Sequence, residues 1–250
     1  MSLIVKKFGG SSVANAERVF NVANRIIKDY KEGHDIVVVV SAQGDTTDDL
    51  IEKAREINPK NPSKREMDML LSAGEQISIS LLAMAIEKLG CPAVSLLGWQ
   101  AGFETDSHYG IARIKKVSAE RIRNEIAKKN IVIVAGFQGL NKYDDITTLG
   151  RGGSDTSAVA IAASMRADLC QIYTDVDGVY TADPKLDPTA VRYDELTYSE
   201  IIDKQLHAID LTAACFCMEN HITTYAFELK DPENIYRAVN GEKVGTEIHN

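Results

Sequence analysis

Short apolar runs alternate with helical patterns along this chain of 250 residues. Residues 36–40 form a continuous, β-branched run, as expected for a strand in a sheet that is covered on both faces. Residues 15–30, which precede it, repeat apolar side chains at helical spacing. This alternation predicts an α/β fold, a three-layer αβα sandwich with a mainly parallel central sheet.

The other elements follow from the same patterns. Further strands are expected at residues 3–5, 92–97, 131–137, 169–174 and 223–227. Further helices are expected at residues 46–57, 66–89, 119–129, 156–167, 210–220 and 232–239. In such a fold, ligands bind at the carboxyl ends of the strands, where the glycine turns of this chain lie.

Composition limits the class of protein. Hydrophobic residues make up 44% and charged residues 26% of the chain, as in ordinary globular proteins. The formal net charge of −8 argues against a nucleic-acid binder. Four cysteines without regular spacing are typical of a reducing cytosol, and neither they nor the five histidines suggest a metal site. We see no signal peptide and no apolar run of about 18 residues, so we expect a cytoplasmic protein without a membrane partner.

The glycine-rich stretch 147–156 is the strongest candidate for a binding site. It lies between the expected strand 131–137 and the Ala-rich helix that follows it. Glycines at a helix start expose N–H groups at the positive end of the helix dipole, which suits phosphate or carboxylate. Arg151 within it could clamp a carboxylate through two parallel hydrogen bonds. Neither a P-loop nor the G-x-G-x-x-G spacing occurs, so phosphate chemistry requires another architecture.

Six ordered stretches carry a family resemblance. They are Lys7-Phe8-Gly9-Gly10-Ser11-Ser12-Val13-Ala14, Val40-Ser41-Ala42, Met69-Leu70-Leu71-Ser72-Ala73-Gly74-Glu75-Gln76, Gln100-Ala101-Gly102, Ala135-Gly136-Phe137-Gln138-Gly139 and the Arg151 loop. At these motifs, residues 1 to about 175 resemble the catalytic domain of aspartokinase, in the amino acid kinase superfamily. The resemblance implies transfer of the γ-phosphoryl group of ATP, used as its Mg²⁺ complex, to the side-chain carboxylate of L-aspartate. That carboxylate, with a pKa of roughly 4, is ionised at neutral pH and needs no general base.

By this resemblance, the catalytic residues are Lys7 and Asp155. Lys7 would meet the transferred phosphoryl group, and Asp155 would orient Lys7. The alternatives are a solvated lysine like its neighbour Lys6 and an acidic residue that stabilises a helix N-terminus. The glycine turn after Lys7 would let the backbone approach phosphate closely, and its members are Gly9, Gly10 and Ser11.

Substrate choice is expected to rest on two charged residues. Arg151 would bind the α-carboxylate of aspartate, and Glu75 would meet its α-ammonium group. The alternative for Glu75 is a solvated charge on a helix. The other expected substrate contacts are Ser41, Thr47, Gly152, Gly153 and Ser154, although each hydroxyl is equally typical of a turn or a helix cap.

The later part of the chain would bind the nucleotide. By resemblance, the contacts to the nucleoside or phosphates are Thr174, Asp175, Tyr180 and Asp183, and Lys185 could reach a phosphate. The alternative is that these positions only form turns. Because no dedicated cage of carboxylates is evident, Mg²⁺ would be held mainly by phosphates and water, and no metal ligand is predicted.

Residues 186–247 resemble bacterial uridylate kinase instead of aspartokinase. The matching stretches are Asp187-Pro188-Thr189-Ala190, Leu196-Thr197-Tyr198-Ser199-Glu200, Ile209-Asp210-Leu211-Thr212-Ala213 and Gly241-Glu242-Lys243-Val244-Gly245-Thr246. The chain therefore reads as a possible chimera joined near residues 175–185. We expect one kinase domain with an acceptor lobe at 1–165, a nucleotide lobe at 166–250, and no ACT regulatory domain. Feedback inhibition by lysine or threonine would then be absent.

One position departs from both families. In the aligned segment 206–210, a lysine near the ATP phosphates is replaced by His207. Histidine is largely neutral at pH 7 unless a phosphate raises its pKa, so ATP binding or turnover is expected to be weaker.

Three functions compete on the sequence. The first is an unregulated aspartate kinase. The second is a UMP kinase, favoured by the tail but not by the earlier lobe. The third is a folded, ATP-binding hybrid with little activity. A homo-oligomer is expected.

Overall fold

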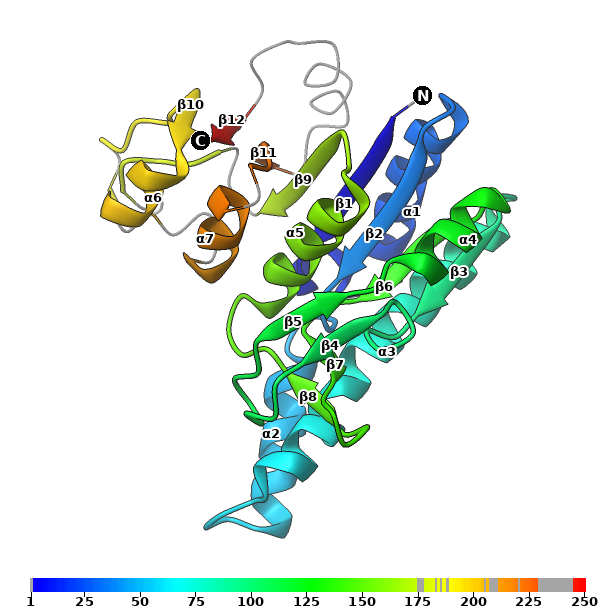
Figure 1. The fold of residues 1–250 in the computed structure, drawn as a ribbon, viewed down its shortest axis with the longest axis vertical. Coiled ribbons are helices and arrows are strands. Elements are labelled where there is room, and N and C mark those ends of the chain that lie inside the picture. The colour runs from blue at the N-terminus through cyan, green and yellow to red at the C-terminus, as the bar shows by residue number, and fades with distance from the viewer. Residues whose placement is uncertain are drawn as a thin grey trace.

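The computed structural model describes residues 2–174, 178–182, 184, 186–187, 189–204, 206, 211–219, 221–228 and 245–250 (Figure 1). The strands are β1 (Leu3–Phe8), β2 (Asp35–Val40), β3 (Ala93–Leu96), β4 (Phe103–Thr105), β5 (Ile114–Val117), β6 (Ile131–Ala135), β7 (Gln138–Leu140), β8 (Ile146–Thr148), β9 (Leu169–Thr174), β10 (Glu195–Thr197), β11 (Thr224–Glu228) and β12 (Thr246–His249). The helices are η1 (Gly10–Val13), α1 (Ala16–Lys31), α2 (Thr46–Ile57), α3 (Lys64–Lys88), α4 (Glu120–Ala127), α5 (Gly153–Met165), α6 (Tyr198–Lys204) and α7 (Leu211–Glu219).

The main sheet has eight strands in the order β10-β12-β11-β9-β1-β2-β6-β3. Every neighbouring pair is parallel except β11 and β12. Strand β1 is central and pairs with both β2 and β9. The prediction of an α/β fold with a mainly parallel sheet is confirmed.

Alternation along β1 divides the core between the two faces of the sheet. Ile4 and Phe8 join a buried cluster with α1 and α3, whereas Val5 joins another with α4, α5 and α7. Period-two alternation is what places successive side chains on opposite faces. The helices therefore cover both faces of the sheet, as the three layers require (Figure 1).

Several predicted boundaries agree closely with the structure. The bounds of α2 and β9 are as predicted, and α1 begins at Ala16 because the side chain of Asn15 accepts a hydrogen bond from the Arg18 N–H at 3.0 Å. The helix predicted at 156–167 begins earlier, at Gly153. Residues 232–239 lie outside the described residues.

A second sheet, of order β5-β4-β7-β8, has no counterpart among the predicted elements. Its strands are three or four residues long, and β5 exposes its two lysines. Such short segments give too few repeats for period-two alternation to be recognised. The strand predicted at 131–137 ends at Ala135, and the chain then turns into this second sheet.

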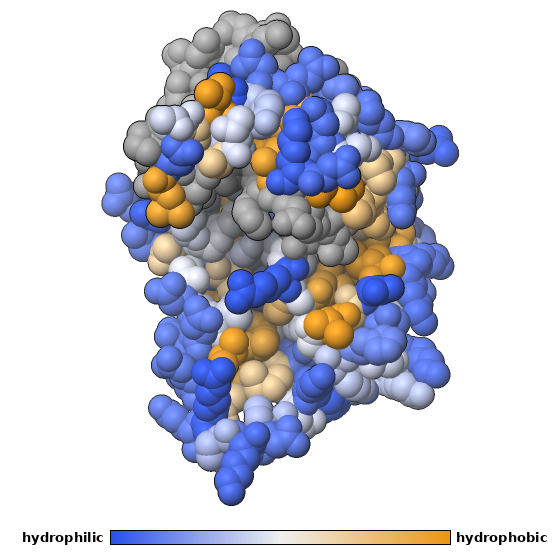
Figure 2. Space-filling model, turned by 90° about the vertical axis from the view of Figure 1, so that its left-hand side faces the viewer, coloured by the Kyte–Doolittle hydropathy of each residue, from blue (hydrophilic) through white to orange (hydrophobic). Residues whose placement is uncertain are grey.

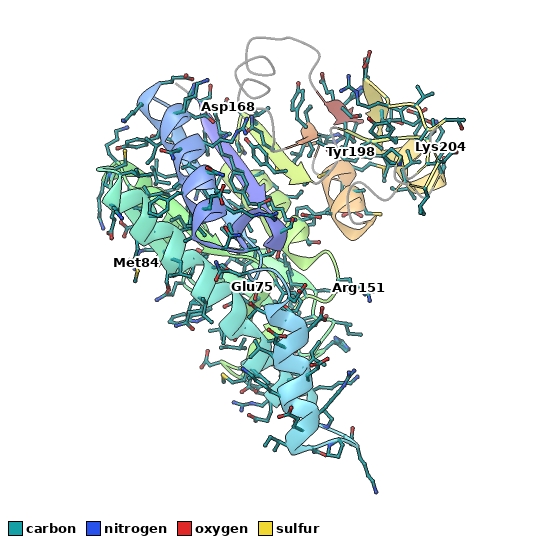
Figure 3. The ribbon with its side chains drawn as sticks, turned by 180° about the vertical axis from the view of Figure 1, so that it is seen from behind. Glu75, Met84, Arg151, Asp168, Tyr198 and Lys204 are labelled. Atoms are coloured by element: carbon teal, nitrogen blue, oxygen red, sulfur yellow. The ribbon has the colours of Figure 1, made fainter. Side chains whose placement is uncertain are left out.

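The face of the molecule in Figure 2 is mostly hydrophilic, with apolar residues gathered in small patches. By length and composition alone, helix α3 is long and apolar enough to cross a membrane. Half of the most apolar 18-residue stretch of α3 is buried inside the fold, however, as in the core helix of a globular protein. Glu75 lies on its inner side, whereas Met84 projects outward (Figure 3).

Lys6 is fully buried, which contradicts the expectation of a solvated lysine. Its Nζ lies 2.5 Å from a carboxylate oxygen of Asp29 in α1 and donates to Gln171 Oε1 at 2.6 Å and to the Tyr173 hydroxyl at 3.2 Å, both in β9. Burial lowers the pKa of Lys6, and Asp29 opposes that effect. This cluster joins α1 to the two central strands.

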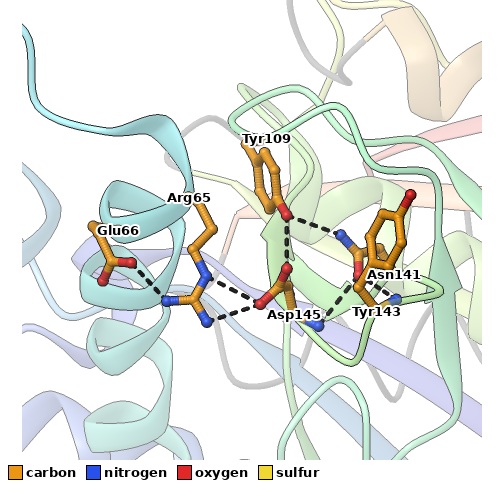
Figure 4. Close-up of polar contacts among 6 residues, drawn as sticks. All are labelled: Arg65, Glu66, Tyr109, Asn141, Tyr143 and Asp145. Atoms are coloured by element: carbon orange, nitrogen blue, oxygen red, sulfur yellow. Dashed lines mark hydrogen bonds and ion pairs between the residues drawn. The ribbon is translucent and has the colours of Figure 1, made fainter.

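The second sheet is attached to α3 by a buried carboxylate. Asp68 accepts hydrogen bonds from the Thr148 N–H at 3.0 Å, the Thr148 hydroxyl at 2.7 Å and the Gly110 N–H at 2.9 Å. One turn earlier, Arg65 donates from Nε and Nη2 to Asp145 at 3.0 and 2.8 Å (Figure 4). Tyr109 donates to the other oxygen of Asp145 at 2.7 Å.

We expect Asp68→Asn to lower the free energy of unfolding by about 1–3 kcal/mol. Donors now point at both carboxylate oxygens of Asp68. In the variant, the amide N–H₂ group would replace one of these oxygens and face a donor, so both groups would be buried without a hydrogen bond. Urea denaturation measures the effect. Asp203→Asn, at an exposed position of α6, is the matched control and should change stability little. Equal free energies of unfolding for the two variants would contradict a stabilising contact of Asp68 between α3 and the second sheet.

Candidate active site

The loops after β1 and β2 meet at the carboxyl end of the sheet. The backbone of Gly10 packs so closely that a Cβ atom there would lie 2.3 Å from the Ala42 carbonyl oxygen. The Gly44 N–H also donates to the Gly10 carbonyl at 3.1 Å. Only glycine fits at position 10, so the turn Gly9–Ser11 follows β1 with its backbone close to the next loop.

Lys7 and Asp155 form an ion pair across this end of the sheet. Nζ of Lys7, from β1, lies 2.7 Å from Oδ1 of Asp155, in the first turn of α5. The side chains retain only 12% and 15% exposure, so the pair borders solvent without being free in it. Successive side chains of a strand point to opposite faces of the sheet. Lys6 points to the α1 face, so Lys7 points to the α5 face. The two residues predicted to act together are therefore in direct contact.

The glycine-rich loop forms the start of α5. Gly150 and Gly152 have φ of 80° and 68°, in the left-handed region that glycine adopts without strain. Gly153 and Ser154 are buried in the first turn, and a Cβ at Gly136 would lie 2.8 Å from Ser154 Oγ. Arg151 is exposed between the glycines and extends toward solvent (Figure 3).

Phe137, a residue with a strained backbone, is hydrogen-bonded to this loop and to α5. Phe137, directly after β6, has φ of 70°, which is uncommon for an aromatic side chain. Its N–H donates to the Ser157 hydroxyl at 3.0 Å, and its carbonyl accepts from the Leu149 N–H at 2.9 Å. Phe137 lies in one of the family motifs, but neither it nor Ser157 was predicted as a functional residue, because backbone strain leaves no pattern in a sequence.

Glu75 is buried, and one of its carboxylate oxygens is unpaired within the described part of the chain. Oε1 accepts from the Ala42 N–H at 3.1 Å, whereas the buried Oε2 accepts no hydrogen bond there. The side chain is only 3% exposed, so the alternative of a solvated helix charge is wrong. Burial raises the pKa of Glu75 to about 7. A carboxylate in this state is suited to a cationic partner.

This raised pKa predicts how stability depends on pH. The folded protein binds a proton at Glu75 that the unfolded chain releases near pH 4.5. The contribution of Glu75 to stability is therefore present below about pH 4.5 and lost as the pH rises through about 7. Relative to wild type, Glu75→Gln should gain on the order of 2–3 kcal/mol over that window.

Thermal unfolding of both proteins between the two pH limits tests this. Glu66→Gln, at an exposed position of the same helix, is the control and should follow wild type. Parallel pH profiles for wild type and Glu75→Gln would refute the raised pKa.

The remaining acceptor-side residues surround the same end of the sheet. Ser41 follows β2, is half-buried, and donates its N–H to the Phe8 carbonyl at 3.2 Å. Thr47 is half-buried in the first turn of α2. Ser11 is exposed in η1. In the described part of the chain, none of these three hydroxyl groups forms a hydrogen bond.

The nucleotide side is only partly described. Thr174 is the last residue of β9, and the residue before it, Tyr173, pairs with Phe8 of β1, directly after Lys7. Tyr180 forms an isolated antiparallel bridge with Arg192. Asp175, Asp183, Lys185 and His207 lie outside the described residues. In the described ranges, no group of three or more histidine, cysteine or acidic side chains is arranged to hold a metal ion.

Residues 2–242 match the amino acid kinase family. The chain belongs to that family. The match covers nearly the whole polypeptide, and the ion pair between β1 and α5 lies within it.

Other members of the amino acid kinase family give a finer comparison. The chain is 56% identical over 204 residues to an aspartokinase of Corynebacterium glutamicum, which is 81% of this chain and 48% of that one. The solved aspartate kinase of Synechocystis superposes with a TM-score of 0.83 at 39% identity, covering 99% of this chain and 40% of that one. The solved uridylate kinase of Archaeoglobus fulgidus gives 0.68 at 29% identity, covering 99% and 100%.

The chain spans about half the length of the curated relatives it matches. Their alignment extends over 203–204 residues, which is longer than the resemblance of about 175 residues found by motif. Sequence similarity to aspartokinases therefore continues past the junction expected near residues 175–185. Uridylate kinases are similar to the chain in structure. These comparisons give no support to a chimera.

Proposed function

We propose that this chain is an aspartate kinase, which transfers the γ-phosphoryl group of ATP to the side-chain carboxylate of L-aspartate. The observation that carries the proposal is its similarity, at 53–56% identity over 81% of the chain, to proteins named aspartokinase. The geometry at the carboxyl end of the sheet supports it, because it combines a cation, a close backbone turn and a buried carboxylate.

In this reaction two anions must be brought together and negative charge must be neutralised. Lys7 would meet the transferred phosphoryl group, with Asp155 fixing its ammonium at 2.7 Å. The backbone turn of Gly9, Gly10 and Ser11 would approach the phosphates, since no side chain fits at Gly10. No residue is needed to remove a proton from the acceptor.

The acceptor, L-aspartate, would be bound at its α-carboxylate and its α-ammonium group. Arg151 is exposed and free to close on the α-carboxylate, and the N–H groups around Gly152 to Ser154 would assist it. Oε2 of Glu75, which has no partner in the described part of the chain, would bind the α-ammonium. Ser41 and Thr47 lie at the same end of the sheet and would contact the aspartate side chain.

On the nucleotide side we propose Thr174, Asp175, Tyr180, Asp183 and Lys185 as contacts, with residues 1–165 as acceptor lobe and 166–250 as nucleotide lobe. Mg²⁺ would enter with ATP and be held by its phosphates. A cytoplasmic location stays a prediction.

His207→Lys is expected to lower the KM for ATP several-fold, because a permanent positive charge would face the phosphates. Steady-state kinetics at neutral pH measures this. Exposed His221→Lys is the control for an added charge. An unchanged KM in His207→Lys would refute a role for this position at the nucleotide.

The function is tested by ADP release with Mg-ATP and either L-aspartate or UMP, with hydroxylamine present to trap an acyl phosphate. Hydroxamate and ADP that depend on aspartate support the proposal. Turnover with UMP alone would assign the chain to the second candidate. ATP binding without turnover on either acceptor would identify an inactive ATP-binding protein.

A further inference from the structure

Asp68 and Glu75 lie on the inner face of the same helix, α3. Their seven-residue spacing is close to two helical turns, so the side chains share a face and lie roughly 10 Å apart along the axis. Both are buried, with 1% and 3% exposure. Glu75 is proposed above to bind the α-ammonium group of the acceptor, whereas the hydrogen bonds of Asp68 lead to two other segments of the chain.

The two segments that donate to Asp68 lie at the base of the Arg151 loop. Thr148, which donates from its N–H and its hydroxyl, is the last residue of β8 and stands three positions before Arg151. Gly110, whose N–H donates at 2.9 Å, belongs to the loop between β4 and β5. One buried carboxylate therefore joins α3 to both segments.

The same two segments contact each other and the Arg151 loop. The Ala112 N–H donates to the Thr148 carbonyl at 2.8 Å. A Cβ atom at Gly150 would lie 3.4 Å from the Gly110 carbonyl oxygen and 3.6 Å from Cγ2 of Ile111, so the loop packs against this segment. The backbone just before Arg151 is thus held by residues that Asp68 binds.

A second link between α3 and these segments is exposed. Arg65 donates to Asp145, which directly precedes β8, and Tyr109 donates to the same carboxylate (Figure 4). The side chain of Arg65 is 41% exposed, and exposed ion pairs contribute little to stability. The buried hydrogen bonds of Asp68 are therefore the stronger restraint on where the two segments lie.

We propose that α3 fixes the distance between the two charges that recognise the acceptor, and that Asp68 is the positioning residue for Arg151. The inference rests on the proposed function, in which Arg151 binds the α-carboxylate and Glu75 the α-ammonium group. An α-amino acid carries both groups on one carbon atom, so the two protein charges must be held at a matching separation. Glu75 is part of α3, and the Arg151 loop is bound to α3 through Asp68, so one helix sets that separation.

Steady-state kinetics with L-aspartate tests the consequence for binding. Asp68→Asn should raise the KM for aspartate about tenfold and change kcat and the KM for ATP less than about twofold, because a displaced Arg151 loop weakens ground state and transition state alike. Glu125→Gln is the matched control, since this carboxylate is 4% exposed and accepts a hydrogen bond from Asn130 at the amino end of β6, away from the site. It should keep the wild-type KM. Equal KM values for aspartate in wild type and Asp68→Asn would overturn the proposal.

A double variant separates positioning of the loop from stabilisation of the fold. In an Arg151→Met background, Asp68→Asn should raise the KM for aspartate less than about twofold, since the contact that Asp68 positions is already lost. Two effects that multiply independently would assign Asp68 a merely structural role.

A milder pair of variants tests the same link without removing a buried charge. Thr148→Val removes one hydrogen bond to Asp68 with little change of shape and should raise the KM for aspartate about threefold. Thr105→Val is the control, because it removes a buried hydroxyl contact to Thr147 within the same sheet and should leave the KM unchanged. Equal KM values for the two variants would overturn the proposal.

Hydrogen–deuterium exchange of the unliganded protein tests the position of the loop independently of activity. The amides of residues 149–154 should exchange about tenfold faster or more in Asp68→Asn than in wild type, and no faster in Glu125→Gln. Unchanged exchange over these residues would overturn the proposal. Faster exchange in Asp68→Asn, combined with a wild-type protein that does not turn over aspartate, would refute the proposed function and leave the positioning of the loop by Asp68 in place.

Discussion

Lys7→Met is expected to reduce aspartate-dependent kcat about 10³-fold or more. The substitution preserves most of the side-chain volume but removes the positive charge that would neutralise the transferred phosphoryl group. The effect should appear in kcat, because the charge matters most in the transition state. ADP release and hydroxamate formation measure it directly.

Two comparisons make this result specific. Lys31→Met removes a lysine that is exposed at the end of α1 and should leave kcat unchanged. Lys6→Met removes the neighbouring, fully buried lysine and should lower stability, because Asp29 would lose its partner. Asp155→Asn should reduce kcat less than Lys7→Met does, since it alters only the position of the ammonium group. A Lys7→Met variant that keeps a tenth or more of wild-type kcat would exclude Lys7 from the reaction.

Glu75→Gln is expected to raise the KM for aspartate about 30-fold or more, with little change in the KM for ATP. Removing one charge of a buried carboxylate–ammonium pair costs about 2–5 kcal/mol of binding free energy. The amide keeps the shape of the side chain and loses the charge. The same substitution should stabilise the unliganded protein near neutral pH, so weaker binding cannot be ascribed to unfolding.

The pH dependence gives a second signature of Glu75. Because its pKa is raised to about 7, the ionised form that would bind the α-ammonium declines as the pH falls below that value. Wild-type kcat/KM for aspartate should therefore fall from pH 8 to about 6, and the Glu75→Gln profile should be flat in that range. Glu66→Gln should retain the wild-type profile. A KM for aspartate that is unaffected by Glu75→Gln would remove Glu75 from the acceptor site.

Most strands and helices of the main sheet were predictable because they depend on local patterns, but β10, β12 and α6 were not predicted. β-Branched runs and helical spacing are each read within a few residues. The motifs around Lys7 and Arg151 likewise identified the family, and the structure brings both motifs to the carboxyl end of the sheet. The second sheet was missed, since strands of three or four residues are stabilised by their neighbours and not by their own sequence.

By itself, then, the sequence determined the α/β fold, the kinase family and the residues that gather at the carboxyl end of the sheet. Only the tertiary structure decided which of two adjacent lysines is buried and which faces Asp155, because the strand alternates and the helices define what each face contacts. It also decided that Glu75 is buried, with a raised pKa and with one carboxylate oxygen that has no partner among the described residues. Burial and charge pairing arise from residues distant in the sequence, so no local pattern contains them.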